Sequence, residues 1–273
     1  MTRSRLLASC LGILALAACG DDSGVGAAPP VGAVRFINAV GDTGALDFRV
    51  VDIVGDAPQF LENSFRLFTP YQAVEAGTRH LRVFLTPSRT DTLVGAPMVW
   101  DTTFAFAEGI NYSVIMTGYA NPTRGVPLSM VITTDDATAP PAGSFGLRVI
   151  NFGSGLGSVD AYTRPRTTAA PGTLFTTDVA FGEVGAYGVQ ATETDTVRMF
   201  IAPTGTTTQL TDVAGPLGVV GTTSANPIAG TRVEGSVLTA IVVPASVAGT
   251  GAGSFATASV LFIADRRPGM TVP

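Results

Sequence analysis

The sequence is poor in several residue types on which common functions depend. It contains no lysine, one histidine, one tryptophan and two cysteines, and charged residues make up only 14% of its 273 residues. The 16 arginines are outnumbered by 21 acidic residues, so the formal net charge is −5 and we expect no nucleic-acid partner. Both cysteines lie within the first 19 residues. Disulfides, zinc–thiolate sites and cysteine catalysis are thereby excluded from the rest of the chain, and we expect no cofactor and no metal.

The chain has no apolar run near its N-terminus that is long enough to span a bilayer. Residues 1–5 carry two arginines and no acid, and the apolar run that follows, Leu6–Ala18, has 13 residues. A spanning helix needs about 20 apolar residues. The run is instead typical of a secretory signal peptide, which we assign to residues 1–18.

The end of this run carries a more specific pattern. Leu16-Ala17-Ala18-Cys19 resembles the bacterial lipobox, in which a leucine and two small residues precede the cysteine that becomes the new N-terminus. The resemblance implies that Cys19 is lipidated and that the chain is cut before it. The alternative is an ordinary signal peptide with an incidental cysteine.

Removal of residues 1–18 takes Arg3 and Arg5 with it and leaves 14 arginines against 21 acids, a net charge of −7. Anionic head groups do not attract such a chain, so the acyl chains on Cys19 would have to hold it at the membrane. Residues 19–33 are small and polar and would form a tether of roughly 20 Å. We expect an extracytoplasmic protein anchored in a membrane, at the outer membrane or cell surface rather than the inner membrane.

The remainder of the chain repeats itself. Val34-Arg35-Phe36-Ile37-Asn38 returns as Leu147-Arg148-Val149-Ile150-Asn151. Five further pairs follow in the same order, and they are Leu46–Phe48 with Val159–Ala161, Phe65 and Tyr71 with Phe181 and Tyr187, Leu81–Leu85 with Val197–Ile201, Glu108-Gly109 with Glu234-Gly235, and Ser129–Thr133 plus Asp135 with Ser259–Ile263 plus Asp265. The extra residues of the second copy fall in Gly-, Thr- and Pro-rich stretches, as loop insertions do. The pattern indicates an internal duplication.

Each copy consists of short segments rich in Val, Ile, Phe and Tyr, separated by Gly and Pro. The strands expected in the first copy are Val34–Asn38, Phe48–Val51, His80–Leu85, Tyr112–Thr117 and Leu128–Thr133. The one segment expected to form a short helical turn is Phe60–Phe68. The sequence predicts an all-β protein of two tandem antiparallel, Ig-like β-sandwiches, at residues 34–136 and 147–266, with a Pro-containing linker at residues 137–146.

The repeated motifs resemble the DUF4397 domain, a bacterial extracytoplasmic β-domain that often occurs in tandem behind a lipobox. The resemblance rests on the Arg-Phe-Ile-Asn opening of the first copy, on Phe65 and Tyr71 six residues apart, and on Asp135-Asp136 shortly before Pro141-Ala142-Gly143. The second copy departs from it at Val159–Ala161 and at Thr192-Glu193-Thr194. The family has no established activity, so the resemblance implies fold and location and no catalytic residue.

Residues that could carry chemistry have plainer explanations. The one histidine, His80, lies in an expected strand and corresponds to Thr196 in the second copy, so we interpret it as a polar strand residue. Asp135-Asp136, or Glu193 with Asp195, are candidate calcium ligands, but the sequence has no calcium-loop motif and we expect solvated loop carboxylates. The glycine-rich stretch Gly153–Ser158 is expected to be a turn, since no helix follows to bind a phosphate.

The recurrent carboxylates Asp47 and Asp160 are expected to cap a turn or to meet Arg35 and Arg148. The recurrent aromatic residues are expected to be sandwich core rather than a binding face. Because strand alternation places Val83 and Phe84 on opposite faces, we expect Val83 and its counterpart Met199 to be deeper than Phe84 and Phe200. Trp100 has no counterpart and is a candidate surface contact.

The predicted function is that of a non-catalytic binding or scaffolding module of the cell envelope, held at the membrane through Cys19. Its partner would be an unknown envelope protein or a glycan. One alternative is an envelope hydrolase, which would need two carboxylates about 5–10 Å apart in one cleft. Another is a structural stalk in a surface complex, which an exposed apolar patch would favour.

Overall fold

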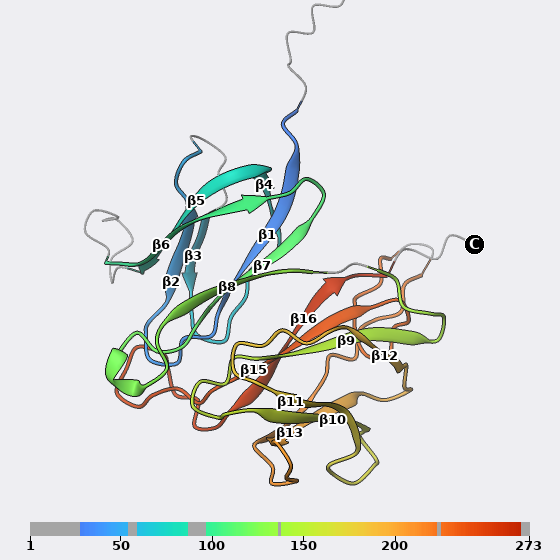
Figure 1. Ribbon diagram of the computed structural model, residues 1–273. Coiled ribbons are helices and arrows are strands. Elements are labelled where there is room, and N and C mark those ends of the chain that lie inside the picture. Colours follow the sequence, from blue (N-terminus) through green and yellow to red (C-terminus); the bar gives the residue numbers. More distant parts are fainter. Residues whose placement is uncertain (1–27, 54–58, 87–96, 136–137, 223–224, 269–273) are drawn as a thin grey trace, which may run out of the picture.

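The computed structural model describes residues 28–53, 59–86, 97–135, 138–222 and 225–268 (Figure 1). Sixteen strands and one short 3-10 helix, η1 (Pro122–Arg124), make up the regular structure of these residues. The protein is all-β, as the sequence predicts. No helix among the described residues has the length and apolar character needed to cross a bilayer.

The strands form four four-stranded sheets, two in each of two sandwich-like units. In the first unit the strands are β1 (Val31–Asn38), β2 (Leu46–Val50), β3 (Gln59–Asn63), β4 (Gln72–Glu75), β5 (Gly77–Leu85), β6 (Met98–Phe106), β7 (Asn111–Thr117) and β8 (Ser129–Thr134). In the second unit they are β9 (Ser144–Asn151), β10 (Val159–Pro165), β11 (Thr173–Val179), β12 (Gly188–Ala191), β13 (Val197–Pro203), β14 (Thr211–Ala214), β15 (Val237–Val243) and β16 (Ser259–Arg266).

The two units have the same topology. The first pairs its strands in the orders β4-β1-β7-β8 and β3-β2-β5-β6, and the second in the orders β12-β9-β15-β16 and β11-β10-β13-β14. Pairing is antiparallel except for β1 with β7 and β9 with β15, which are parallel. Two parallel strands must be joined by a long crossover connection. Here the segment of chain that joins them contains all four strands of the second sheet of the same unit.

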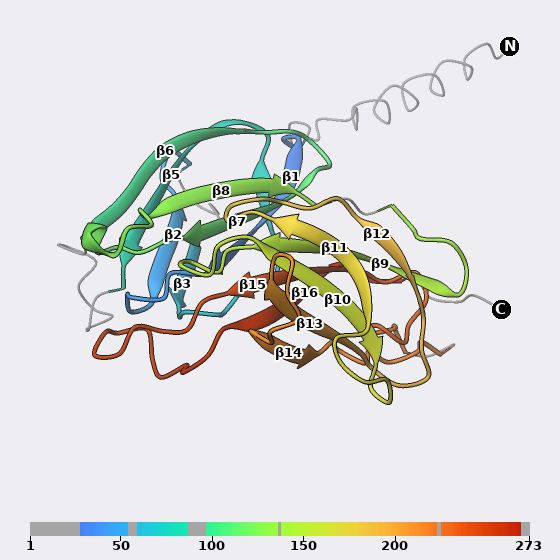
Figure 2. The same ribbon diagram turned by 60° about the horizontal axis from the view of Figure 1, so that its bottom comes forward.

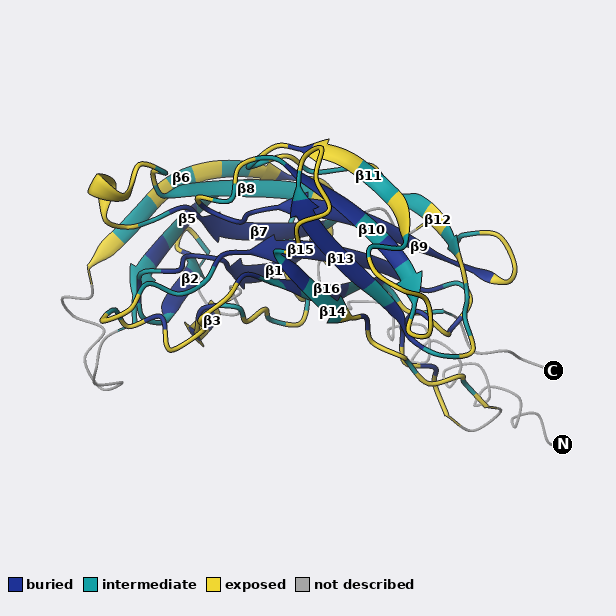
Figure 3. Cartoon of the chain, turned by 90° about the horizontal axis from the view of Figure 1, so that it is seen from below, coloured by how far each residue is buried: buried dark blue, intermediate teal, exposed yellow. Residues whose placement is uncertain are grey.

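The two inner sheets, those of β1 and β9, lie next to each other, so the molecule is a stack of sheets (Figure 2). Their central strands β1, β7, β9 and β15 are buried almost throughout (Figure 3). Alternate residues of these strands face opposite ways. On β1, Val34 and Phe36 enter the core of the first unit, whereas Ile37 packs with Ile150 of β9 in a separate cluster.

The molecule therefore has three apolar cores. Each unit has its own, and the third cluster combines residues of both units, namely Ile37, Ala39, Ile115, Ile150, Phe152, Ile241, Val243 and Ile263. A sandwich with a solvated outer face would show polar residues at these positions. The continuous apolar runs of the central strands thus report burial on both faces.

Two expectations about particular elements are corrected. The short helical turn expected in Phe60–Phe68 is wrong, because β3 occupies its first part. The backbone there is bent by Glu62, whose φ is 54° and whose N–H donates to the Asp47 carboxylate at 2.9 Å. Asp178, with a φ of 52°, makes the same bend against Asp160 in the second unit. The second correction concerns Phe200.

Val83 and Met199 are the deep residues of their strands, as predicted, with exposed fractions of 0% and 1%. Phe84 is half-buried, as expected, but Phe200 is only 2% exposed. Tyr162 covers Phe200 edge-on, with 5.9 Å between ring centroids. Phe84 is covered instead by the Arg49 guanidinium, 5.4 Å from its ring centroid. The expectation that both phenylalanines are partly exposed therefore fails for Phe200.

Candidate functional site

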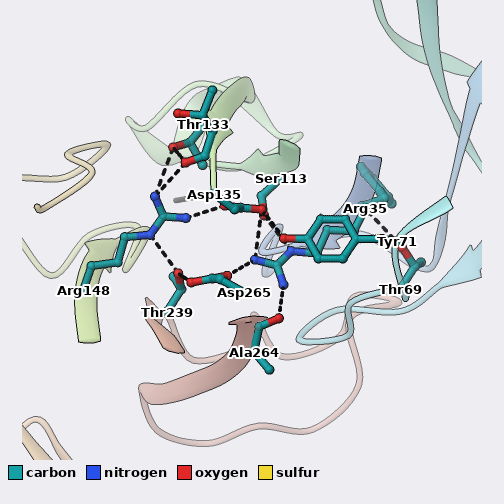
Figure 4. Close-up of polar contacts among 12 residues, drawn as sticks. Arg35, Thr69, Tyr71, Ser113, Thr133, Asp135, Arg148, Thr239, Ala264 and Asp265 are labelled. Carbon is teal, nitrogen blue, oxygen red and sulfur yellow. Dashed lines mark hydrogen bonds and ion pairs between the residues drawn. The ribbon is translucent and has the colours of Figure 1, made fainter. Parts of the chain in front are cut away.

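Four buried charged side chains form one cluster between the two units. Its charged members are Arg35, Asp135, Arg148 and Asp265 (Figure 4). Both aspartate side chains are completely buried, and the arginine side chains are 2% and 3% exposed. Two positive and two negative charges compensate each other, which is the condition for keeping ions in such a place.

The ion pairs cross from one unit to the other. Arg35 of β1 donates through Nη2 to Asp265 of β16 and through Nη1 to the Ala264 carbonyl at 2.9 Å. Arg148 of β9 donates through Nη2 to Asp135, which follows β8, and through Nη1 to the Thr134 carbonyl at 3.0 Å. Each arginine thus binds the last strand of the other unit.

Further contacts hold each carboxylate within its own unit. Asp135 Oδ2 lies 3.2 Å from Arg35 Nη2 and accepts hydrogen bonds from Tyr71 Oη and, at 2.7 Å, from Ser113 Oγ. In the second unit, Asp265 accepts from Tyr187 Oη at 2.7 Å and from Thr239 Oγ1. Each arginine Nε donates at 2.7 Å to the hydroxyl of its own unit, Ser113 or Thr239.

The tyrosine rings complete the cluster on both sides. The guanidinium carbon of Arg35 lies 4.6 Å from the ring centroid of Tyr71, and that of Arg148 lies 4.5 Å from that of Tyr187. Both are cation–π distances. The cluster therefore consists of two equivalent sets of four residues, one per unit, related by an approximate two-fold arrangement.

Burial and the neighbouring charges shift the pKa values of four members of the cluster. Burial acts to lower the pKa of Arg35, but Asp135 and Asp265 raise it above its usual value. Burial also raises the pKa of Asp265, against the opposing effect of Arg35. Burial raises the pKa values of Tyr71 and Tyr187 well above the usual value for tyrosine. Arg35, Tyr71 and Tyr187 therefore stay protonated at neutral pH.

The four charged residues of this cluster are recognisable in the sequence as recurrent residues, but the partners expected for the two arginines were wrong. Arg35, Arg148, Asp135 and Asp265 all recur between the copies, and an arginine inside an apolar strand needs a carboxylate. The expectation that Asp47 and Asp160 meet these arginines fails, because each carboxylate binds the bent backbone of the neighbouring strand, β3 or β11. Asp47 accepts from the N–H of Glu62, and Asp160 from the N–H groups of Asp178 and Gly205 at 2.9 Å. The alternative that they cap a turn holds for Asp160, at Gly205, whereas Asp47 binds within β3 and pairs with Arg49 at 3.0 Å.

Asp135 is a buried ion-pair partner, so the expectation of a solvated loop carboxylate is wrong for it, and Asp136 lies outside the described residues. Among those residues no group of three or more His, Cys, Asp or Glu side chains could hold a metal ion. Asp135 and Asp265 converge, but neither carboxylate is exposed and both bind arginine. This pair is therefore closed to a substrate.

The remaining predicted positions lie away from the cluster. His80, on β5, has Nε2 against Asp101 of β6, and this hydrogen bond lowers the pKa of Asp101. Trp100 is half-buried and packs against the core of the first unit. Gly153–Ser158 forms the turn between β9 and β10, as expected. Cys19 and residues 1–18 lie outside the described residues.

Two shallow clefts lie near the junction of the units. The first, of about 500 Å³, is lined by Asp42–Gly44 and Arg124 of the first unit and by Thr250-Gly251 of the second. Asp42 accepts there from the N–H groups of Ala120 at 2.8 Å and Asn121 at 3.0 Å, so its carboxylate is already bound. The second, of about 620 Å³, borders Asp135.

Comparison with known proteins agrees with the family resemblance over part of the chain. Residues 32–162 match the family model "Domain of unknown function (DUF4397)". The matched range contains the first unit together with β9 and the start of β10. The DUF4397 resemblance predicted from the sequence is confirmed over this range. No curated protein matches the chain.

Among solved structures, the chain is similar to a carbohydrate-binding module, CBMbc of family CBM26 from Eubacterium rectale Amy13K, solved in complex with maltoheptaose. The identity is 10% and the TM-score 0.24, over 84% of this chain and 95% of that chain.

Proposed function

We propose that the protein is a non-catalytic binding or scaffolding module of the cell envelope, anchored in the membrane by acyl chains on Cys19. The anchor is supported by Leu16-Ala17-Ala18-Cys19 at the end of a 13-residue apolar run. Two or more acyl chains are the condition for stable anchoring. The extracytoplasmic placement, with the outer membrane or cell surface favoured, follows from the same signal.

The binding or scaffolding role is supported by one observation: the buried charges bind one another and so join the two units. The four charged residues of the cluster are bound to one another across the two units, together with two tyrosines and two hydroxyls. Groups held in this way position two sandwiches and leave no free acid or base among them. A rigid pair of sandwiches on a tether would present its loops to a glycan or to another envelope protein.

The anchor is tested by fractionating cells that produce the Cys19→Ser variant. We expect this variant to leave the membrane fraction or to accumulate as an uncleaved precursor, whereas the wild-type protein stays with membranes. Cys10→Ser is the matched control, because Cys10 lies inside the segment that is removed and its loss should change nothing. Cleaved Cys19→Ser protein that still fractionates with membranes would contradict the anchor.

The binding role is tested with the unlipidated mature chain, residues 20–273, immobilised and exposed to envelope extracts. We expect it to retain a specific glycan or protein that a heat-unfolded sample does not retain. Release of hydrolysed product from those extracts by the same chain would support the hydrolase alternative and overturn the non-catalytic one.

A further inference from the structure

The second unit carries an exposed apolar ribbon for which the first unit has no counterpart. In the first unit only Ala107–Ile110 connect β6 to β7, whereas residues 215–236 connect β14 to β15 in the second. We define the arm as the two legs Pro216–Thr222 and Ala225–Ala229. Most residues of the two legs are exposed, whereas the base of the connection is largely buried.

The base of the arm is firmly held. Ala229 belongs to the core of the second unit, and Thr231 is 1% exposed. Gly218 of the first leg touches Gly230, directly after the second leg, since a Cβ on Gly230 would lie 2.2 Å from the nitrogen of Gly218. Farther out, Val219 and Ile228 exchange backbone hydrogen bonds of 2.9 Å in both directions. The arm therefore has a fixed base and an internally paired backbone.

Its large aliphatic side chains face the solvent, whereas Thr222 and Asn226 are polar and Pro227 is buried. Leu217, Val219, Val220 and Ile228 are 44–60% exposed. No charged residue occurs between Asp212 and Arg232. Exposed apolar surface of this kind marks a contact with a protein or a membrane. The arm contains no aromatic residue and no arginine, the side chains that dominate protein-binding hot spots.

Basic side chains lie beside the base of the arm. Arg232 is exposed, and its N–H donates to the Leu217 carbonyl. Arg267 is also exposed and precedes Pro268, which packs within 3.4 Å of the position of a Cβ on Gly235. The acid of this region, Glu234, accepts from the N–H of Gly143. Exposed aliphatic residues on the legs, with arginines at the base, suit a lipid surface with anionic head groups.

We propose that this arm is a second membrane contact, which enters the lipid–water interface through Val219, Val220 and Ile228 while Arg232 and Arg267 meet lipid phosphates. The proposal rests on the lipid anchor at Cys19 only for its proximity, because a tether of roughly 20 Å keeps the body next to a bilayer. The paired backbone of the ribbon allows it to enter the interface without unsatisfied polar groups between its legs. The anchor together with the arm would fix the orientation of the body, which a tether alone leaves free.

The test uses the near absence of thiols from the mature chain. Val220→Cys is introduced into the lipidated protein and labelled with an environment-sensitive dye, since acylation blocks Cys19. In vesicles of phosphatidylethanolamine and phosphatidylglycerol, we expect blue-shifted emission that is quenched by brominated lipids. The matched control is Leu174→Cys, which replaces an aliphatic residue of β11 with 50% exposure and should report water. Equal signals from the two positions would overturn the proposal.

The count of dyes separates this proposal from the anchor. One dye per chain means that Cys19 is blocked, and two mean that the anchor has failed. In the latter case the two labels are compared in the Cys19→Ser background with added vesicles, and the same difference between positions 220 and 174 is required. As a second measurement, Val219→Asp with Ile228→Asp should lower vesicle binding of that background about tenfold or more. Loss of a concentration-dependent dimer instead would assign the arm to a second copy of the chain.

Discussion

Arg35 shows at the scale of one residue how the two units are joined. Like Ile37, it turns away from the core of its own unit, whereas its neighbours Val34 and Phe36 turn toward that core. All three of its nitrogen donors are used, on Ser113, Ala264 and Asp265. A lysine at this position has one donor group and could not bind all three partners at once.

Arg35→Met is therefore expected to destabilise the protein by about 3–5 kcal/mol, because it leaves the buried carboxylates of Asp135 and Asp265 without full compensation. The matched control is Arg82→Met. Arg82 is 39% exposed and pairs with Asp101, and the loss of such a surface pair costs about 0–1 kcal/mol. Chemical denaturation of both variants measures the difference. Similar losses for the two would show that the buried cluster contributes no more than a surface pair.

The carboxylate of Asp160 links stability to pH. Burial acts to raise its pKa, but hydrogen bonds from Thr177 Oγ1 and from the N–H groups of Asp178 and Gly205 lower it below the ordinary value. An acid whose pKa is lowered by folding stabilises the protein above its unfolded pKa, near 3.9, and loses that contribution as the pH falls through the folded value.

Asp160→Asn should therefore be less stable than the wild type at neutral pH. The difference between their free energies of unfolding should become smaller as the pH falls from about 5 to about 2. Urea denaturation at a series of pH values measures this difference. A difference that stays constant throughout this range would mean that the hydrogen bonds do not act on the charged form.

Equivalent elements of the two units are not equally buried. β5 and β13 occupy the same place in their sheets, yet Phe84 is half-buried and Phe200 is buried beneath Tyr162. Phe200→Ala should cost about 3–5 kcal/mol, and Phe84→Ala less than half of that, because truncation leaves a cavity only where the ring is enclosed. The free energies of unfolding of the two variants decide the matter. The reverse order would mean that Phe84 supports the first unit in a way that its exposure does not indicate.

The strands were the part of the structure that the sequence predicted best. Alternation located β5, and apolar runs located β1, β7 and β8 to within a few residues. The helical turn expected near Phe60 failed because local hydrophobic spacing does not report the bend at Glu62, which depends on Asp47 from the neighbouring strand. The same apolar runs also indicated that these strands are buried on both faces, because such strands do not alternate between apolar and polar residues.

The partners of Arg35 and Arg148 could not be predicted from the sequence, because the packing of the two units determines which residues they contact. Arg35 and Asp265 are 230 residues apart, and only the stacking of the two inner sheets brings them together. The sequence identified both arginines and both aspartates as recurrent residues, but recurrence does not say which residue contacts which. The relative placement of two units is set by the face they share, and that face becomes visible only in three dimensions.

At the scale of the whole molecule, the two sandwiches are one body. A cluster of eight apolar residues from both units surrounds the junction, and ion pairs cross it in both directions. Arg66 of the first unit adds a contact at one end, where its guanidinium carbon lies 4.5 Å from the ring centroid of Phe255 in the second. Separating the units would expose apolar strand faces and unpaired buried charges together, so neither unit should unfold alone.

Differential scanning calorimetry of the unlipidated mature chain tests this most directly. One transition is expected, with calorimetric and van't Hoff enthalpies that agree, because the units share a core and a buried ionic cluster. Arg35→Met should lower the temperature of that whole transition, although the substituted residue lies in the first unit. Two resolved transitions, of which only one moves in Arg35→Met, would contradict the account and show that the sandwiches unfold as independent domains.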